Sequence, residues 1–542
     1  MTKHQIQNPI LPGYYPDPSI CRAGDDYYLV CSSFEMTPGI PIFHSHDLAH
    51  WTQIGNALTK ENGFHIERDG GVGGLMAPTI RYHEGMFYII DTNLSDKGNF
   101  IITAEDPAGP WSEPHWMTDV PDIDASLFFD DDGQCYIVGI GDCIDLGNGK
   151  KDRGFWLAKY DIHTFTRLSE PKVIFDSALR RAWSPEAPHI YHIGEYYYLF
   201  FAEGGTEHYH AEMCARSKEL FGFYEGCPAN PILTHRHMGY KSPIINVGHA
   251  DLVQIQDGSW YAVFLGSRLV DGNHKNLGRE TWLCPVEWER DWPLFSPQTG
   301  KVEWNYDAPE CLPWEPIAPV DDREDFEDDQ LPMYMTFWGT PADGTVKVED
   351  SRLKLRCIRQ APDDELVPMD LSPATYKDRF AAFAARRQCA LHVQVSTKMQ
   401  FVPQGTERAG VAVVQAMNHQ LLAERAMENG ISILRLVLVT AEYSGYPFFP
   451  GFSSQTHREV LKSIPYEDEE IVISLDLDRQ NYTVSYGKSE DALKVLDVVD
   501  GRQINAERVG CMAGTQIAMF ATGSGTDSEN YAAFDWFSYK EI

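Results

Sequence analysis

The first three hundred residues carry a repeated pattern of hydrophobic and polar positions. Each repeat opens with one residue, usually polar, that is followed by a short link of small residues or proline. An apolar residue, a turn and a run rich in aromatic residues then follow in that order. Each unit predicts a β-hairpin, because aromatic and β-branched residues favour strands and glycine favours the turn. The aromatic runs of the five units are Tyr27–Val30, Phe87–Ile90, Tyr136–Val138, Tyr197–Phe200 and Trp260–Val263.

The spacing of these units predicts how the hairpins are organised. They begin roughly 50 to 60 residues apart, which is enough for a four-stranded sheet with its turns. No segment of this region has a helical period sustained over three turns. We therefore expect residues 1–315 to form a five-bladed β-propeller.

The residues that open the repeats are expected to share one place in the fold. In a propeller, the innermost strand of each blade starts near the central axis, so these residues would face one cavity. Three of the five are carboxylates, which would meet there although they lie far apart in the chain. The opening residues are Asp17, Met76, Asp124, Glu186 and His249.

The pattern changes after about residue 315. Residues 322–542 alternate strand-like runs with turns rich in glycine, proline, asparagine and aspartate, which predicts a two-sheet, jelly-roll-like β-sandwich. Phe520 belongs either to the core of this sandwich, which is the simpler interpretation, or to the rim of the propeller cavity. The clearest predicted strands are Leu353–Cys357, Ala390–Val395, Ile471–Leu477 and Ala532–Tyr539.

Composition narrows the choice of partner. The 542 residues include 45 lysines and arginines against 79 aspartates and glutamates, a net charge of −34. This balance argues against nucleic acid and against anionic membrane surfaces, which both require a basic face. The strongly negative chain is better suited to bind a neutral ligand than a polyanion.

Targeting and redox signals are weak. The chain has neither an N-terminal apolar run of signal-peptide length nor an apolar stretch long enough to span a membrane. Its 11 cysteines are scattered singly, without the paired spacing of zinc sites or disulfide frameworks. We therefore expect reduced thiols and a cytoplasmic protein, and the sequence leaves open whether it forms a homo-oligomer.

Five segments, in this order along the chain, resemble motifs of glycoside hydrolase family 43. The resemblance is to the bacterial β-xylosidase/α-L-arabinofuranosidase branch, which has a C-terminal sandwich. It implies a five-bladed propeller, an exo-acting sugar pocket and inversion at the anomeric carbon. The segments are Asn8–Ile20, Asp124–Phe128, Ser184–Pro188, Asn273–Thr281 and Arg323–Phe326.

The resemblance implies roles for the three carboxylates. Asp17 would be the general base, Glu186 the general acid, and Asp124 a third carboxylate that orients the acid and keeps its pKa raised. Structural alternatives are an Asp-Pro turn at Asp17, a solvated acidic loop at Asp124 and a salt-bridged Glu186. The presence of all three in matching repeats favours catalysis.

The same resemblance implies substrate contacts. Arg279 would donate hydrogen bonds to sugar hydroxyls, although it could also be an ion-pair partner of Glu280. Phe34 is either an aromatic wall of the pocket or a core residue. Relatives in this family often carry tryptophan where Leu75 and Met76 stand here, which leaves the choice between xylose and arabinose open.

A divalent cation is expected as well. The resemblance implies that His274 binds a calcium ion on the propeller axis, largely through waters, and oxygen-rich shells suit this hard cation. His249 could bind the metal instead, or contact the sugar.

The sequence thus predicts an inverting enzyme that releases D-xylose from the non-reducing ends of β-1,4-xylooligosaccharides, with α-L-arabinofuranosidase side activity. One rival is a predominantly α-L-arabinofuranosidase enzyme acting on arabinosyl substrates. The other is a non-catalytic carbohydrate-binding propeller, which would not need an acid/base pair.

Overall fold

The structure is a computed structural model that describes residues 4–66, 73–147, 149–176, 183–318, 320, 322–363, 380–444, 453–505 and 513–542. Across these ranges the regular elements are strands, apart from short 3-10 helices, and none of the helices is long and apolar enough to cross a membrane. The ten cysteines within them are free thiols, as expected. The 3-10 helices are η1 (Lys60–Asn62), η2 (Arg236–Met238), η3 (Glu490–Ala492) and η4 (Gly501–Gln503).

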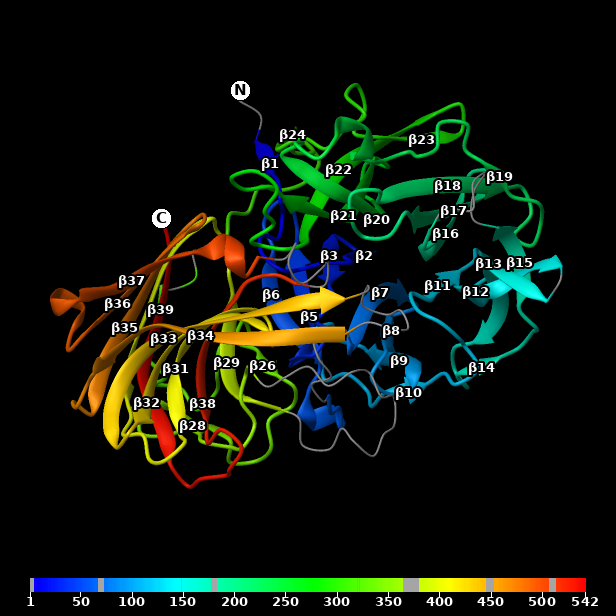
Figure 1. Ribbon diagram of the computed structural model, residues 1–542. Coiled ribbons are helices and arrows are strands. Elements are labelled where there is room, and N and C mark those ends of the chain that lie inside the picture. The colour runs from blue at the N-terminus through cyan, green and yellow to red at the C-terminus, as the bar shows by residue number, and fades with distance from the viewer. Residues whose placement is uncertain are drawn as a thin grey trace.

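The N-terminal part, blue to green in Figure 1, is a succession of antiparallel sheets built from consecutive strands. Each sheet begins with one of the predicted hairpins. The first two sheets are β2 (Ser19–Ala23), β3 (Asp26–Val30), β5 (Gly39–Ser45) and β6 (Thr52–Leu58), then β7 (Leu75–His83), β8 (Met86–Asn93), β9 (Gly98–Ala104) and β10 (His115–Trp116).

Three further sheets complete this part. The strands are β11 (Ser126–Phe129), β12 (Cys135–Gly147), β13 (Lys150–Asp161), β14 (Thr166–Arg167) and β15 (Lys172–Asp176); β16 (Glu186–Ile193), β17 (Tyr196–Glu203), β18 (Ala211–Ser217) and β19 (Glu225–Gly226); and β20 (Ile244–Gln254), β21 (Trp260–Arg268), β22 (Glu280–Glu289) and β23 (Trp292–Phe295). In the third sheet, a fifth strand, β15, pairs with the same strand, β13, as the fourth strand does.

The first strands of these sheets surround one axis. β2 contacts β7 and β20, β7 contacts β11, and β16 contacts β11 and β20. The two ends of the part are joined, because β1 (Gln5–Gln7) pairs with β24 (Asn305–Asp307). The start of every sheet therefore lies near the same central space.

A left-handed backbone position recurs at an equivalent place in every sheet, within or just before the first strand. Its φ lies between 52° and 60°, a region that residues other than glycine rarely adopt. Met76 and Glu186, taken from the sequence as opening residues, lie one residue before this position. The recurring residues are Asp17, Ala77, Asp124, Ala187 and His249.

The C-terminal part is a sandwich of two antiparallel sheets, and the four clearest predicted strands are present in it. One sheet is β27 (Val346–Val348), β28 (Leu353–Arg356), β39 (Tyr531–Glu541), β30 (His392–Gln400), β35 (Glu470–Asp478), β36 (Asn481–Gly487) and β37 (Lys494–Asp500), with β25 (Arg323–Glu324) beside β39. The other is β29 (Ala382–Arg387), β38 (Gln516–Thr522), β31 (Arg408–Ala416), β32 (His419–Glu428), β33 (Ile431–Ser444) and β34 (Ser453–Pro465).

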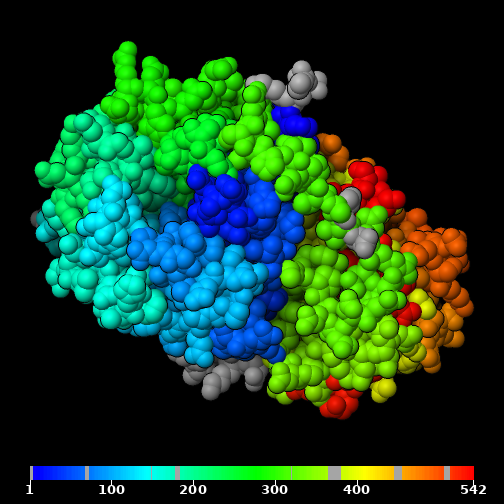
Figure 2. Space-filling model, turned by 180° about the vertical axis from the view of Figure 1, so that it is seen from behind, coloured from blue at the N-terminus to red at the C-terminus, as the bar shows by residue number. Residues whose placement is uncertain are grey.

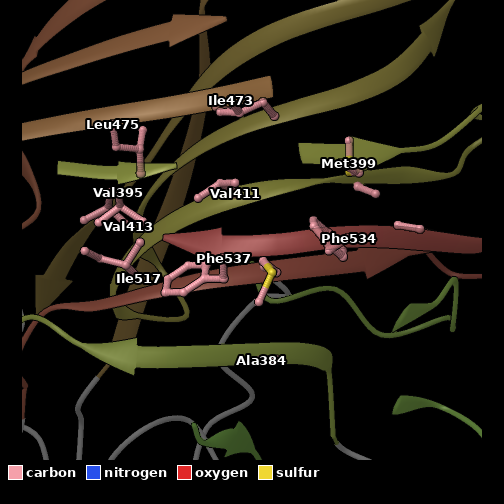
Figure 3. Packing of buried hydrophobic residues seen from close by; sticks show 14 of the residues in the cluster. Ala384, Val395, Met399, Val411, Val413, Ile473, Leu475, Ile517, Phe534 and Phe537 are labelled. Carbon is pink, nitrogen blue, oxygen red and sulfur yellow. The ribbon is translucent and has the colours of Figure 1, made fainter. Parts of the chain in front are cut away.

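The inward faces of the two sheets form the core of the sandwich. Val395 and Leu475 come from one sheet and Val413 and Ile517 from the other, and all four are buried in one cluster (Figure 3). Burial of such aliphatic side chains supplies most of the stability of a sandwich.

The two parts lie against each other (Figure 2). Strand β4 (Met36–Thr37) of the N-terminal part pairs with β26 (Phe337–Trp338) of the sandwich side. The indole Nε1 of Trp338 donates to Oε2 of the buried Glu35 at 2.6 Å. Phe520 belongs to the apolar cluster that includes Trp338 and packs against Met36, whereas Met519 and Ala521 on either side of it face the core between the two sheets. Phe520 therefore lies on the outer face of its sheet, at the contact between the two parts, and the simpler interpretation of it as a sandwich-core residue is wrong.

We expect Trp338→Phe to lower the free energy of unfolding by about 1–3 kcal/mol, because the buried Glu35 carboxylate loses a donor. Thermal unfolding of the variant, followed by calorimetry, measures the loss. The control is Trp304→Phe, since Trp304 is 39% exposed. Equal unfolding temperatures for Trp338→Phe and the control would show that this bond does not stabilise the contact between the parts.

Candidate active site

Asp17 is held by two donors from distant parts of the chain. Its Oδ1 accepts from Nη1 of Arg279 at 2.6 Å, and its Oδ2 accepts from the Ser32 hydroxyl at 2.6 Å. Arg279 also donates to Thr206, and Ser32 accepts from the backbone N–H of Ala77. Since Asp17 is only 5% exposed, these bonds fix the orientation of its side chain.

Asp124 and Glu186 lie close to Asp17 and to each other. The backbone N–H of Ala187 donates to Asp124 at 3.2 Å, which ties the third and fourth sheets together beside Glu186. Burial raises the pKa of Glu186 to about 7, with a further contribution from the negative charge of Asp17 and against an opposing hydrogen bond from Ser184. Burial, followed by the charge of Glu186, also raises the pKa of Asp124 well above its usual range.

Phe34 is part of a small apolar cluster beside these carboxylates. Its ring stacks on Tyr14 at 5.6 Å between centroids, packs with Met76, and lies 5.7 Å from the guanidinium carbon of Arg279. Gly74 permits this arrangement, because a Cβ there would lie 2.3 Å from the Phe34 carbonyl oxygen. Met76 is therefore part of the apolar cluster around Phe34.

Two buried imidazoles adjoin the carboxylates. Nδ1 of His249 lies 3.9 Å from Oδ1 of Asp17, and burial lowers the pKa of His249, so the ring is neutral. His210, which the sequence analysis missed, is 1% exposed, and burial lowers its pKa to about 3. Its Nδ1 is 2.7 Å from the Asn246 carbonyl, and within the described residues its Nε2 has no partner.

A buried polar network fills the centre where the first strands meet. The Arg81 guanidinium bonds to Asp251 at 2.8 Å and to Nδ1 of His189 at 3.0 Å. Ser19 donates to the same carboxylate at 2.5 Å, and Tyr191 donates to it as well. Sequence analysis missed this network, although Ser19, His189 and Asp251 all lie two residues after the left-handed position.

His274 lies in the loop between β21 and β22, on the side of the sandwich. Arg502, and then the charge of His274, lowers the pKa of Asp500 in the sandwich. Asp500 bonds to Arg502 at 2.8 Å, and Asp271 of the same loop bonds to Arg479 at 3.0 Å. Calcium at His274 therefore remains a prediction that these contacts do not support, because the nearby carboxylates already hold arginines.

Comparison with known proteins identifies both parts of the chain. Residues 6–293 match the model of the glycosyl hydrolases family 43, and residues 323–540 match that of the β-xylosidase C-terminal concanavalin A-like domain. The first match covers more than half of the chain and contains Asp17, Asp124 and Glu186.

Individual relatives are similar over nearly the whole length. A xylosidase/arabinosidase of Butyrivibrio fibrisolvens is 38% identical, with 99% of each chain covered. A non-reducing end α-L-arabinofuranosidase of Bacteroides ovatus is 36% identical over 100% of this chain and 96% of its own. The solved xylan β-1,4-xylosidase of Bacillus halodurans C-125 is 28% identical with a TM-score of 0.85, covering 99% of this chain and 100% of that one. Matching models for both parts and full-length relatives show that this chain belongs to glycosyl hydrolase family 43 and is a glycosidase.

Proposed function

We propose that this glycosidase is an exo-acting, inverting β-xylosidase on a five-bladed propeller spanning residues 1–315, with residues 322–542 as its sandwich domain. It would release D-xylose from the non-reducing ends of β-1,4-xylooligosaccharides, with α-L-arabinofuranosidase side activity. The observation that carries the proposal is the pairing of Asp17, bonded to Arg279, with Glu186, whose pKa is raised to about 7.

The environments of these two groups suit opposite tasks. Asp17, as a carboxylate, would take the proton of the attacking water, while Glu186, kept protonated, would give its proton to the leaving oxygen. Asp124 would help to hold the proton on Glu186, since two neighbouring carboxylates disfavour ionising together. Arg279 would orient Asp17 and donate to sugar hydroxyls, with Phe34 and the neutral His249 lining the same space.

The choice of sugar depends on the wall of the pocket. Relatives of this chain include both a xylosidase/arabinosidase and an α-L-arabinofuranosidase. Met76 packs on Phe34, and its flexible thioether adapts to more than one ring shape. This packing supports activity on both sugars. The alternative, a predominantly α-L-arabinofuranosidase enzyme, therefore needs to be tested as well.

We expect the wild-type chain to hydrolyse 4-nitrophenyl β-D-xyloside with a higher kcat/KM than 4-nitrophenyl α-L-arabinofuranoside. Release of xylose from xylotriose, analysed by NMR at early times, should give the α-anomer first, as inversion requires. Preference for the arabinofuranoside would favour the alternative enzyme, and a β-anomer first product would contradict inversion. If neither glycoside is hydrolysed, the proposal that this chain acts on xylosides or arabinofuranosides is contradicted.

A further inference from the structure

A second group of polar side chains lies on the first sheet, at the end away from Asp17. His44 lies near the end of β5, and His46 directly follows the last residue of that strand, so the two side chains are two positions apart and point to the same side. Asp26 opens the adjacent strand β3, which pairs with β5 through Tyr28 and His44. The Nε2 atoms of His44 and His46 lie 2.6 and 2.8 Å from the same Oδ1 of Asp26.

The imidazole of His46 is also held at its other ring nitrogen, Nδ1. Oε2 of Glu315 lies 2.7 Å from Nδ1 of His46, which directs Nε2 toward Asp26. Carboxylates bonded to the far nitrogen of a histidine are typical of metal sites, where they fix the ring and raise its basicity. The ring of His44 is held as well, because it packs against Tyr28 at 5.1 Å between centroids.

We propose that His44, His46 and Asp26 form a zinc site, with Glu315 as its outer partner. Two imidazole nitrogens and one carboxylate oxygen are a donor set that zinc prefers over calcium or magnesium. A water would take the fourth position, since the side chains of His46 and Asp26 are 41% and 37% exposed.

The spacing of the donor atoms suits this ion. The three ligand atoms all lie within 4.8 Å of one another. Bonds of about 2.0–2.1 Å in a tetrahedron place ligand atoms about 3.3 Å apart, so the two contacts with Asp26 need to open by only about 0.5–0.7 Å. Asp26, at the end of a hairpin turn and partly exposed, has room to make this movement.

The site would have a structural role. Besides contacting His46, Glu315 donates its backbone N–H to Asp47 at 3.0 Å, and it lies on the segment that leads to the sandwich. Zinc would therefore tie the β3–β5 pair to that segment. Ligands that bind only the folded chain raise its stability by mass action.

A second cluster provides a matched comparison. Asp130, Asp131 and His192 also bring three donor atoms together, but only one is an imidazole nitrogen, and Asp131 is 84% exposed. Because imidazole ligands dominate zinc affinity at neutral pH, this cluster is expected to bind zinc far more weakly. A substitution there controls for the general effect of removing a surface histidine.

The experiment is calorimetric titration of Zn²⁺ into the untagged, metal-stripped full chain. We expect one tightly bound Zn²⁺ per chain, an affinity at least about 100-fold lower in His46→Gln, and about 10- to 100-fold lower in Glu315→Gln, the outer-partner variant. Glutamine keeps much of the hydrogen bonding of His46, and Asp26→Asn is a second variant should His46→Gln fold poorly. His192→Gln should bind as the wild type does.

Thermal unfolding supplies a second measurement. Zn²⁺ should raise the unfolding temperature of the wild type and of His192→Gln, but not that of His46→Gln. Hydrolysis of nitrophenyl xyloside should be unchanged in His46→Gln, because the cluster lies at the far end of β2 from Asp17. Equal zinc affinity in the wild type and His46→Gln, or loss of binding in His192→Gln, would overturn the proposal.

Discussion

Glu186→Gln is expected to reduce kcat/KM for xylobiose by about 10²–10⁴-fold, the usual contribution of a general acid. The loss should be much smaller for 2,4-dinitrophenyl β-D-xyloside, because dinitrophenolate leaves without being protonated. Initial rates with both substrates, for the wild type and the variant, measure this difference. A loss of equal size on the two substrates would contradict the role of Glu186 as acid.

The pH dependence of the wild type gives a control on the same group. Glu186 acts only while protonated, and its pKa is raised to about 7. kcat/KM for xylobiose should therefore fall as the pH rises through about 7, approaching tenfold per pH unit. In Glu186→Gln this alkaline decline should disappear, and a wild-type profile that stays flat to pH 9 would contradict a pKa near 7.

The same variant should be more stable than the wild type in alkaline solution. Folding raises the pKa of Glu186 from 4.5 to about 7, so the folded chain favours the protonated form. This contribution is fully present below pH 4.5 and is lost as the pH rises through 7. Glutamine cannot ionise and does not lose this contribution. The free energy of unfolding of Glu186→Gln, measured relative to that of the wild type, should therefore be higher at pH 8 than at pH 4 by up to about 3 kcal/mol. Calorimetric unfolding at both pH values tests this gain.

The fold was predictable because its signals are local and repeated. Each hairpin combines an aromatic run with a nearby turn, and five copies reinforce one another. The sequence also indicated that Asp17, Asp124 and Glu186 would be brought together. The register was less accurate at Glu186, because the left-handed position falls on Ala187, and nothing in a single residue type marks that conformation.

Contacts between distant side chains could not be predicted in the same way. The bonds from Arg279 to Asp17 and from Trp338 to Glu35 join residues 262 and 303 positions apart, and neither follows a period in the sequence. Ser19, His189 and Asp251 of the central network share a place two positions after the left-handed site, but this shared place is visible only once the backbone conformation is known. A pattern of hydrophobic and polar positions places strands, whereas such pairs depend on how the sheets are finally arranged.

Asp17→Asn is expected to lower kcat/KM by about 10²–10⁴-fold or more on xylobiose and on the dinitrophenyl xyloside alike. Activation of water is required whatever the leaving group, so this variant should show none of the substrate dependence predicted for Glu186→Gln. Ser32→Ala is the matched control, because it removes one hydrogen bond to Asp17 but keeps the carboxylate and its contact with Arg279.

The two variants together distinguish the general base from the general acid by kinetics alone, without a structure of a substrate complex. If Asp17→Asn retained activity on the dinitrophenyl substrate while Glu186→Gln lost it, the roles would have to be exchanged. Asparagine matches aspartate in size, so the cavity should keep its shape, and unfolding temperature and circular dichroism check that it does. A loss confined to a folded Asp17→Asn, and only slight in Ser32→Ala, would then be due to the missing proton acceptor.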